Sequence, residues 1–398
     1  MGKIFGIDLG TTYSCIAYVN EYGVAEVVNN QDSSPVTPSV VAFEDGGAVS
    51  VGSAAKETLN SDPDNVCSTI KRQMGKRDYM FNAFGKEYSP EAISSLILQK
   101  LTKDASEVLG EEVKDVVITC PAYFGLDERD ATQKAGEIAG LNEPTAAAIS
   151  YGMQVENPQT IMVYDLGGGT FDVTIIKVEN GKIQVVATGG DHMMGGKDWD
   201  DAIREYTINT YCEQTGESSD SIYDDSEAMG DLELKAETAK KQLTQKEKAI
   251  IKLNGEKIEI SRELFDEKTH DHLESTITKT RETMADAAKK GVTAYDKILL
   301  VGGSTRMPQV MERLKQEFPN TPIEFCDPDQ SVAKGAAIYG INMAAFNQSG
   351  CEIKIPEEEK EEIKNNPIFK FGSASQAQPL TIVNVISQSI AVRLYCQD

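Results

Sequence analysis

The chain has 398 residues, which is long for one hydrophobic core and predicts two or more lobes. Its net charge of −24 argues against nucleic acid and anionic membranes as main partners. No apolar run reaches the ~20 residues of a membrane span, and the first residues run directly into a strand, which predicts no secretory signal. The seven cysteines form no CxxC pair and only three histidines are present, so we expect reduced thiols, no zinc site and a cytoplasmic location.

The first half of the chain alternates strands and helices. Two apolar strands flank the segment Asp8–Thr12. Ser89 is typical of a helix N-cap, and apolar residues at steps of three and four then predict a helix that ends at Gly110. A buried strand over 116–119 precedes a second predicted helix over 127–139. This order predicts an α/β fold with helices on the faces of a sheet.

The second half starts with a glycine hairpin. One apolar strand rises to Asp165, three glycines at 167–169 turn the chain, and Thr170 leads into a second apolar strand. Glycine readily adopts the backbone angles of such a turn, so the pattern predicts a β-hairpin whose tip is rich in N–H groups. Asp8–Thr12 has the same order of strand, Asp-Leu-Gly, threonine and strand, so the pattern is an internal repeat.

Further strands and helices follow in the second half. Gly302, Gly303 and Ser304 join a strand to a helix; such a turn lets a base or ribose approach the backbone, although an ordinary helix start is an equal alternative on this pattern alone. The predicted elements are a strand over 182–188, a helix over Ser226–Leu243, a hairpin at Asn254-Gly255, a long helix from Ser261 towards Lys290, a strand over 295–301 and a final helix over Ser331–Ala345.

Two Asp-Leu-Gly hairpins that face each other would clamp a polyphosphate. Their backbone N–H groups and the hydroxyls of Thr11, Thr12 and Thr170 are donors for phosphate oxygens. Asp8 and Asp165 suit water-mediated contact with Mg²⁺, and phosphoryl transfer requires mainly positioning and charge neutralisation. One glycine turn is weak evidence for a ligand, whereas two matching copies favour nucleotide binding over two plain tight hairpins.

Five motifs together resemble one family. They are Gly6–Ser14, Pro121–Phe124, Asn142–Ala148, Asp165–Val173 and Leu300–Pro308. With them, the chain from about residue 3 to 346 resembles the nucleotide-binding domain of the 70-kDa heat-shock (DnaK-type) chaperones, within the superfamily of actin, sugar kinases and heat-shock ATPases. The resemblance implies an α/β, two-lobed actin-like ATPase fold built from duplicated ribonuclease H-like domains, with a short β segment at the C-terminus.

The resemblance also implies a domain order. In the nucleotide-binding domain, residues 1–346, lobe I would span about 1–158 and lobe II about 159–346. Residues 347–379 are rich first in Glu and Lys and then in Gly, Ser, Ala and Gln, which indicates an acidic tether. Residues 380–398 would form an apolar linker, resembling the family's at Ile382–Ile386, and the start of a truncated substrate-binding domain.

Catalytic and metal-binding roles follow from the same resemblance. Lys71 would position the attacking water near the γ-phosphate, Glu143 would act through the water and metal network, and Thr170 would bind or sense the γ-phosphate. Asp8 and Asp165 would hold hydrated Mg²⁺ and nearby K⁺, and Asp165 also counts among the catalytic residues. Without the resemblance, Lys71 would be interpreted as an ordinary surface lysine.

The nucleotide itself would contact residues from both lobes. Without the resemblance, the side chains from Glu237 to Thr244 would be interpreted as a solvated helix face. The implied set is Thr11, Thr12, Tyr13, Gly167, Gly168, Gly169, Asp172, Gly195 and Gly196 near the phosphates and ribose, and Glu237, Lys240, Lys241, Thr244, Gly302, Gly303, Ser304, Arg306 and Asp329 around the adenosine.

The implied function is a Mg²⁺-dependent ATPase that couples ATP and ADP states to binding and release of unfolded polypeptides in the stress response. Pro121 and Arg129 match the pair that relays nucleotide state to the substrate domain. A J-domain co-chaperone and a nucleotide-exchange factor are the expected partners, with no nucleic acid and no membrane. The alternatives are an actin-like filament protein, a sugar or acetate kinase, for which no motif is found, and a regulatory relative that barely hydrolyses ATP.

The chain departs from the family pattern at three places. Gly140-Leu141 runs almost directly into Asn142, where the family has a short apolar strand. Either the chain has lost this strand or residues are omitted here, and we expect omission because a helix needs a connector before a turn at Glu143. Lys197 stands where an acid is usual. The tether is longer and more acidic than usual and the linker is not leucine-rich, which questions allosteric coupling more than ATP binding.

Overall fold

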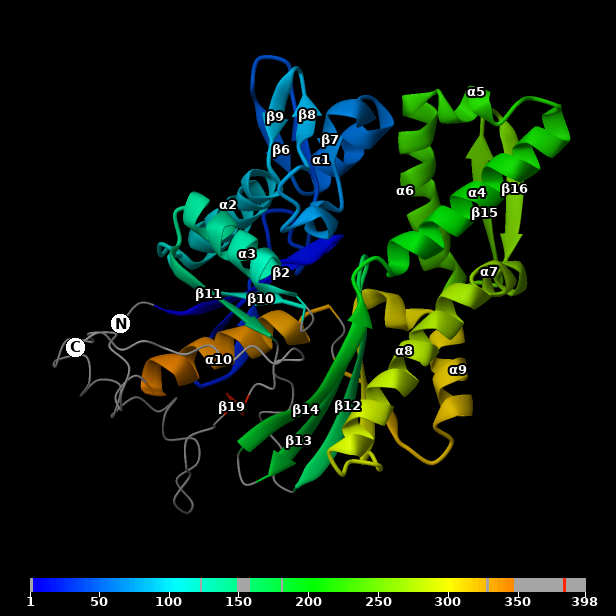
Figure 1. Ribbon diagram of the computed structural model, residues 1–398. Helices are drawn as coiled ribbons and strands as arrows, with labels where there is room; N and C mark the ends of the chain where they lie inside the picture. Colours follow the sequence, from blue (N-terminus) through cyan, green and yellow to red (C-terminus); the bar gives the residue numbers. More distant parts are fainter. Residues whose placement is uncertain are drawn as a thin grey trace.

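Two lobes, each built on one mixed sheet, make up the protein (Figure 1). The computed structural model describes residues 3–121, 124–148, 158–179, 182–326, 329–346 and 382–383. The strand order is β11-β10-β1-β2-β3 in the first sheet and β18-β17-β12-β13-β14 in the second. In both sheets the first hairpin strand pairs antiparallel with the second and parallel with its other neighbour. The shared topology confirms the predicted duplicated, two-lobed α/β architecture.

The first sheet is covered by helices on both faces. Successive side chains of a strand point to opposite faces; Phe5 and Ile7 join the core with α2 and α3, whereas Gly6 faces α10, where a Cβ atom would lie 2.2 Å from the Ala333 carbonyl oxygen. The elements are β1 (Phe5–Asp8), β2 (Tyr13–Val19), β3 (Ala25–Val27), β4 (Thr37–Pro38, paired with β2), β10 (Asp115–Cys120), β11 (Asn142–Ala148), α2 (Pro90–Leu109), α3 (Leu126–Ile138) and α10 (Ser331–Phe346).

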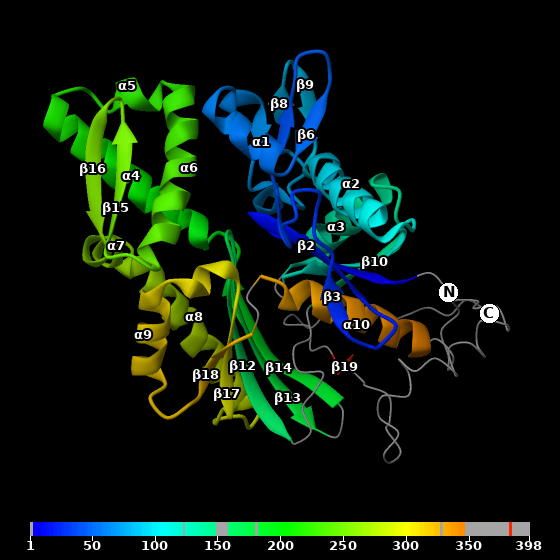
Figure 2. The same cartoon turned by 180° about the vertical axis from the view of Figure 1, so that it is seen from behind.

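The position of α10 differs from the expected domain order. The domain order implied by the resemblance places this helix in the second lobe, but it packs along β1, β2 and β10 of the first (Figure 2). Ala333 and Ala337 share a cluster with Cys15 and Ala17 of β2, since small side chains allow the helix to lie close to the sheet. The last helix therefore returns to the first lobe.

Short elements form the upper part of the first lobe. Lys71 lies in one of them, the 3₁₀ turn η3, beside the cleft. They are β5 (Val41–Phe43), β6 (Val49–Val51), β7 (Val66–Cys67), β8 (Phe81–Ala83), β9 (Lys86–Tyr88), α1 (Ser53–Glu57), η1 (Thr58–Asn60), η2 (Pro63–Asn65) and η3 (Ile70–Gln73).

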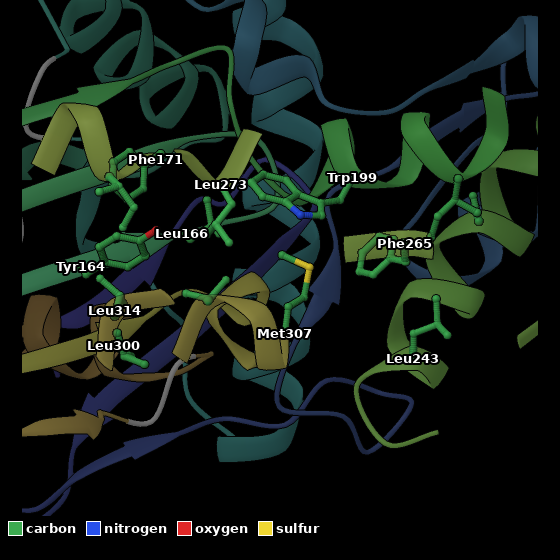
Figure 3. Packing of buried hydrophobic residues seen from close by; sticks show 14 of the residues in the cluster. Tyr164, Leu166, Phe171, Trp199, Leu243, Phe265, Leu273, Leu300, Met307 and Leu314 are labelled. Atoms are coloured by element: carbon green, nitrogen blue, oxygen red, sulfur yellow. The ribbon is translucent and has the colours of Figure 1, made fainter. Parts of the chain in front are cut away.

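The second sheet is packed against α8 and α9. Its core contains Tyr164 and Phe171 from the two hairpin strands, with ring centroids 4.7 Å apart, and the nearby Trp199 of α4 (Figure 3). The elements are β12 (Gln159–Leu166), β13 (Phe171–Glu179), β14 (Lys182–Asp191), β17 (Lys297–Val301), β18 (Ile323–Phe325), α8 (His270–Lys289), α9 (Pro308–Glu317) and η4 (Gly303–Arg306).

Above this sheet, four helices surround a β-hairpin. The predicted turn at Asn254-Gly255 has positive φ at both residues, as a two-residue hairpin requires. The predicted helix from Ser261 is broken at Thr269, which is fully buried and whose hydroxyl donates to the Phe265 carbonyl at 2.7 Å. The elements are α4 (Gly196–Thr215), α5 (Asp220–Tyr223), α6 (Ser226–Leu243), β15 (Lys248–Leu253), β16 (Glu256–Ser261) and α7 (Arg262–Lys268).

Two C-terminal residues join the second sheet. Ile382–Val383 forms β19, which pairs in parallel with β14 at residues 183 and 184. These are the first residues of the segment Ile382–Ile386, which resembles the family's linker. The tether over 347–379 and the rest of 380–398 lie outside the described residues. No helix in the described ranges is long and apolar enough to span a membrane.

Candidate functional site

A cleft of about 500 Å³ lies between the lobes, beside the tips of the two hairpins. Most residues that the sequence assigned to a ligand line it, although Asp8 and Asp329 are far apart in the chain. The predicted residues that line it are Asp8, Thr11, Thr12, Tyr13, Lys71 and Pro121 on one side, and Asp165, Gly167, Gly168, Thr170, Asp172, Glu237, Lys240, Lys241, Thr244, Gly302, Gly303, Ser304, Arg306 and Asp329 on the other.

The first hairpin, β1–β2 with its turn, is held by serines of its own lobe. The Ser14 hydroxyl accepts from the Gly10 N–H at 3.1 Å, and the Ser39 hydroxyl donates to the Gly10 carbonyl at 2.8 Å. The two hydroxyls lie 2.8 Å apart, and the Ser39 N–H donates to the Thr12 carbonyl at 2.9 Å. These bonds fix the turn that follows Asp8.

The second hairpin, β12–β13 with its turn, is held by other elements. The Gly167 carbonyl accepts from the Gly196 N–H at 2.9 Å and from the Ser304 hydroxyl at 2.9 Å. The Gly168 carbonyl accepts from the Lys197 N–H at 2.7 Å. The Gly167 N–H donates within the turn, to the Thr170 carbonyl at 3.0 Å. The groups that the turn can offer an anion are therefore the N–H groups that follow Gly167 and the Thr170 hydroxyl.

The two hairpins meet tip to tip, which is why glycine is needed there. A Cβ atom on Gly168 would lie 2.0 Å from the Thr12 hydroxyl, and one on Gly169 would lie 2.2 Å from Thr11 Cγ2. Gly195 packs in the same way against the Gly169 backbone. The hairpins therefore face each other as the repeat predicted.

Three glycines predicted to bind the nucleotide do not line the cleft. Gly169 and Gly195 lie in the contact between the hairpins and α4, and a Cβ atom on Gly196 would lie 2.2 Å from the Ser304 hydroxyl oxygen. Their role in the structure is to allow close packing behind the cleft wall.

Two carboxyl groups from opposite lobes share the floor of the cleft. Burial raises the pKa of Asp8, against the opposing effects of Lys71 and of the Thr119 hydroxyl, which donates to Asp8 at 3.1 Å. Burial, with added repulsion from Asp8, raises the pKa of Asp165 to about 7, and Lys71 again opposes the shift. Two acids near one lysine leave a site that favours a further cation.

This floor fits the implied Mg²⁺. Within the described ranges, no three His, Cys, Asp or Glu side chains gather closely enough to hold a metal by themselves. Mg²⁺ uses few protein carboxylates and takes its other ligands from water and phosphate oxygens. Asp8 and Asp165 can hold such a hydrated ion, which would stabilise both carboxylates in their charged form.

The segment that contains Glu143 is a strand, where a turn was predicted. It forms β11, in which Asn142 pairs with Asp115 and Ala148 pairs with Cys120 beside the cleft. At about 3.3 Å per residue, the backbone of Glu143 lies roughly 16 Å along the strand from that end. The predicted turn is wrong because only residues 139–141 separate α3 from this strand position, so the motif itself fills the edge of the sheet.

The upper wall of the cleft comes from α6 and the η4 turn. Glu237, Lys240, Lys241 and Thr244 recur at steps of three and four and therefore share one helix face, which lines the cleft. Opposite them, Gly302 adopts a φ of 81° that lets the chain pass close to Leu166. Arg306 pairs with Asp329 at 2.7 Å beside this turn.

An outer bridge joins the lobes across the mouth of the cleft. Tyr13 donates from its hydroxyl to Glu237 at 2.8 Å, and Lys56 of the first lobe forms an ion pair with Glu237. Lys241 also pairs with Glu237, at 2.7 Å. Burial alone would raise the pKa of Glu237, but the two lysines hold it down to about 2.

An inner bridge joins the lobes at the floor. Arg72 donates to the Gly169 carbonyl at 3.0 Å and to the Asp198 carboxylate at 2.6 Å. Sequence reasoning missed Arg72 and Asp198, as well as Lys56 and Asp200. Asp198 is an acid in the first turn of α4, and such acids favour helix starts, which is a signal that could have been used.

Buried charges also support α4 at the cleft. Lys240 donates to the Gly196 carbonyl at 2.7 Å and to Asp200 at 2.8 Å. Burial raises the pKa of Asp200 to about 6, although Lys240 opposes the shift. Lys197, the unusual residue in its motif, lines the cleft and pairs with Glu233 at 3.1 Å.

The two residues predicted to relay the nucleotide state differ in their position relative to the cleft. Pro121 lines the cleft, whereas Arg129 lies on α3 outside the lining and donates to the Phe124 carbonyl at 2.8 Å. Both thus lie near the end of β10, but only Pro121 borders the cleft.

The comparison with known families agrees with this geometry. The family model described as Hsp70 protein matches residues 4–82 and 78–353, which together span most of the chain. The matched range contains both hairpins, the acidic floor and the α6 wall. The match supports a chaperone ATPase domain that binds ATP or ADP with Mg²⁺.

Proposed function

The chain belongs to the Hsp70 family, and we propose that its cleft binds Mg²⁺-ATP and hydrolyses it to control polypeptide binding in a domain beyond the linker. One observation carries this proposal. Two glycine hairpins from opposite lobes meet tip to tip. The first strand of each brings a carboxyl group, Asp8 or Asp165, to the floor of one cleft, and Lys71 lines the same cleft.

The first step of the proposed reaction is binding of the triphosphate by the two turns. The N–H groups of the turns and the hydroxyls of Thr11, Thr12 and Thr170 donate to phosphate oxygens. Mg²⁺, when bound, would supply charge neutralisation. Asp8 and Asp165 would hold it, and K⁺ beside it, through water, which would account for two acids on the floor.

Lys71 is the proposed catalytic group for the attacking water. It lies on the first lobe in the cleft, with its Nζ 6.0 Å from the centre of the Phe124 ring. An ammonium group in that position orients a water molecule and stabilises the negative charge on the transferred phosphoryl group.

The adenosine occupies the upper cleft in this proposal. The α6 face, with Glu237, Lys240, Lys241 and Thr244, and the turn at Gly302–Ser304 form opposite walls. A flat base fits between them, with Arg306 beside it. The outer bridge then holds the bound nucleotide until the lobes open.

The proposed coupling runs from the lobes to the linker. ATP and client polypeptide would each favour a different docked state, which is linkage between two sites. β19 supports a route for this coupling because it extends the second sheet, whose hairpin lines the cleft. A J-domain protein and an exchange factor would act on this cycle.

Single-turnover hydrolysis with Mg²⁺ and K⁺ tests the proposal. Replacing Lys71 with Ala is expected to lower the rate by about 100-fold or more while ATP binding persists, because catalytic positioning is lost. Lys76→Ala is the matched control, since that exposed lysine lies on the same segment. A normal rate in Lys71→Ala would refute the assignment, and sedimentation after ATP addition would reveal a filament protein instead.

The position of β11 favours a second candidate, a regulatory relative that binds ATP but hydrolyses it slowly. The backbone of Glu143 lies in β11 near its start, several residues along the strand from the end at Ala148. If this candidate is correct, the wild-type chain binds ATP but turns it over slowly, and Glu143→Gln leaves that rate unchanged. A large loss of rate in Glu143→Gln would exclude it.

A further inference from the structure

Arg72 makes the inner bridge with two bonds of different kinds. Its Nε atom donates to the Gly169 carbonyl at 3.0 Å, and a terminal nitrogen donates to Asp198 at 2.6 Å. The side chain is only 11% exposed, so water screens this ion pair less than a surface pair. A planar guanidinium presents its donors to both acceptors in one fixed geometry, whereas the donors of a lysine lie on a single flexible nitrogen.

The two acceptors belong to different parts of the nucleotide site. Gly169 is the last glycine of the second hairpin turn. Asp198 also accepts from the Gly195 N–H at 2.7 Å and thereby fixes the start of α4. One side chain of the first lobe therefore contacts both elements that shape the second lobe at the floor of the cleft.

Lys71 shares the short η3 turn with Arg72. The residue before this turn, Thr69, has a φ of 57°, a left-handed conformation that costs energy for a residue other than glycine. Ile70, which directly precedes Lys71 in the chain, is buried. A strained entry, a buried anchor and the Arg72 bridge together leave the Lys71 backbone little freedom.

Arg72 and Asp198 do not belong to the lining of the cleft, whereas Lys71 does. Arg72 therefore contacts residues next to the ligand site but does not itself line the cleft. From these contacts we propose that Arg72 is a positioning residue: it aligns Lys71 with the second hairpin only when the lobes are closed. The inference rests on the proposed hydrolysis at Lys71.

The central test separates rate from affinity in the full chain. Arg72→Gln removes the charge and the two-pronged donor, and it is expected to lower the single-turnover rate by about 10- to 100-fold, the effect of misplacing a catalytic group by about 1 Å. ADP affinity should change by less than about threefold, because the adenosine wall is untouched. The single-turnover rate of Arg72→Lys should lie between that of Arg72→Gln and that of the wild type.

Two comparisons distinguish positioning from general destabilisation. Arg77→Gln is the matched control, since Arg77 is 85% exposed and pairs only with Asp127 among the ion pairs found in the described ranges. In a Lys71→Ala background, Arg72→Gln should change the residual rate by less than about twofold, because residues that act as one unit are not additive. An additional tenfold loss in that background would overturn the proposal.

Hydrogen exchange tests the bridge without turnover. Arg72→Gln should speed exchange in both residues 66–74 and residues 195–200 of the free protein, and Arg77→Gln should speed neither. Unchanged exchange in both segments would refute the inference even if hydrolysis were absent. A wild-type chain that fails to hydrolyse ATP but shows the exchange effect would instead refute the proposed function and leave the bridge intact.

Discussion

The two hairpins have matching sequences and opposite kinds of support. Ser14 and Ser39 hold the first from within one lobe, through uncharged hydroxyl groups. The second is held by the start of α4, by Ser304 and, across the cleft, by Arg72. Repetition of a motif therefore does not mean repetition of its surroundings.

This difference separates a fixed side of the cleft from an adjustable one. The position of the first turn depends on its own lobe. The position of the second turn depends also on the closure of the lobes, because Arg72 comes from the opposite side, and on charged groups such as the half-buried Asp198 and the buried Asp200. A ligand-driven change of lobe angle is thus expected to reach the second hairpin first.

Replacing one glycine of each hairpin with alanine is expected to have the largest effects. A Cβ atom on Gly10 would lie 1.9 Å from the Tyr13 carbonyl oxygen, so the clash is with the backbone of the same hairpin. Gly10→Ala is expected to lower the free energy of unfolding by about 3 kcal/mol or more. Chemical denaturation measures this loss.

Gly168→Ala places its clash across the cleft, against Thr12. Opening of the lobes relieves it, so ADP affinity is expected to fall by about 10- to 100-fold while the free energy of unfolding changes less than in Gly10→Ala. Titration with ADP and denaturation of both variants supply the comparison. Equal losses of stability would show that the second hairpin is as fixed as the first.

A pH series tests the charged support of the second hairpin. The pKa of Asp200 is about 6 in the folded chain and ordinarily 3.8, so the folded state binds more protons between these values. Stability should therefore fall as pH rises from about 4 to 6, by roughly 3 kcal/mol in total. Denaturation at several pH values should show this loss of stability in the wild type and not in Asp200→Asn.

Asp201→Asn is the matched control for that series, since Asp201 follows on the same helix and is more exposed. Its pH profile should resemble that of the wild type. A wild-type profile in Asp200→Asn would mean that the burial of this carboxyl group does not affect the folded state. The serine hydroxyls that hold the first turn do not titrate in this range, so a slope from the first hairpin would come from Asp8, whose pKa burial raises.

The sequence predicted those parts of the molecule that depend on local patterns. The hairpin turns, the helix start at Ser89 and the end at Gly110 follow from residue preferences within a few positions, and the structure confirms them. The repeat of Asp8 and Asp165 also predicted that two halves share one topology.

Features that depend on distant packing could not be predicted in this way. Arg72 and Lys56 resemble ordinary surface side chains until the second lobe is placed beside them. The break at Thr269 arises from burial against α9, which contributes Gln309. Glu143 was misplaced because its motif indicates a turn, whereas the short link after α3 requires a strand at the edge of the sheet.

The smallest expected effects come from the two serines that hold the turns. Ser39→Ala removes the Ser39 hydroxyl from both the Gly10 carbonyl and the Ser14 hydroxyl, which keeps only the Gly10 N–H as a partner, so it should cost about 2 kcal/mol of stability. Ser304→Ala removes one bond to the Gly167 carbonyl, which keeps the Gly196 N–H as donor, so about 1 kcal/mol is expected. Thermal unfolding of both variants gives the order. If Ser304→Ala were the costlier change, the second hairpin would depend on the η4 turn more than on α4 and the opposite lobe.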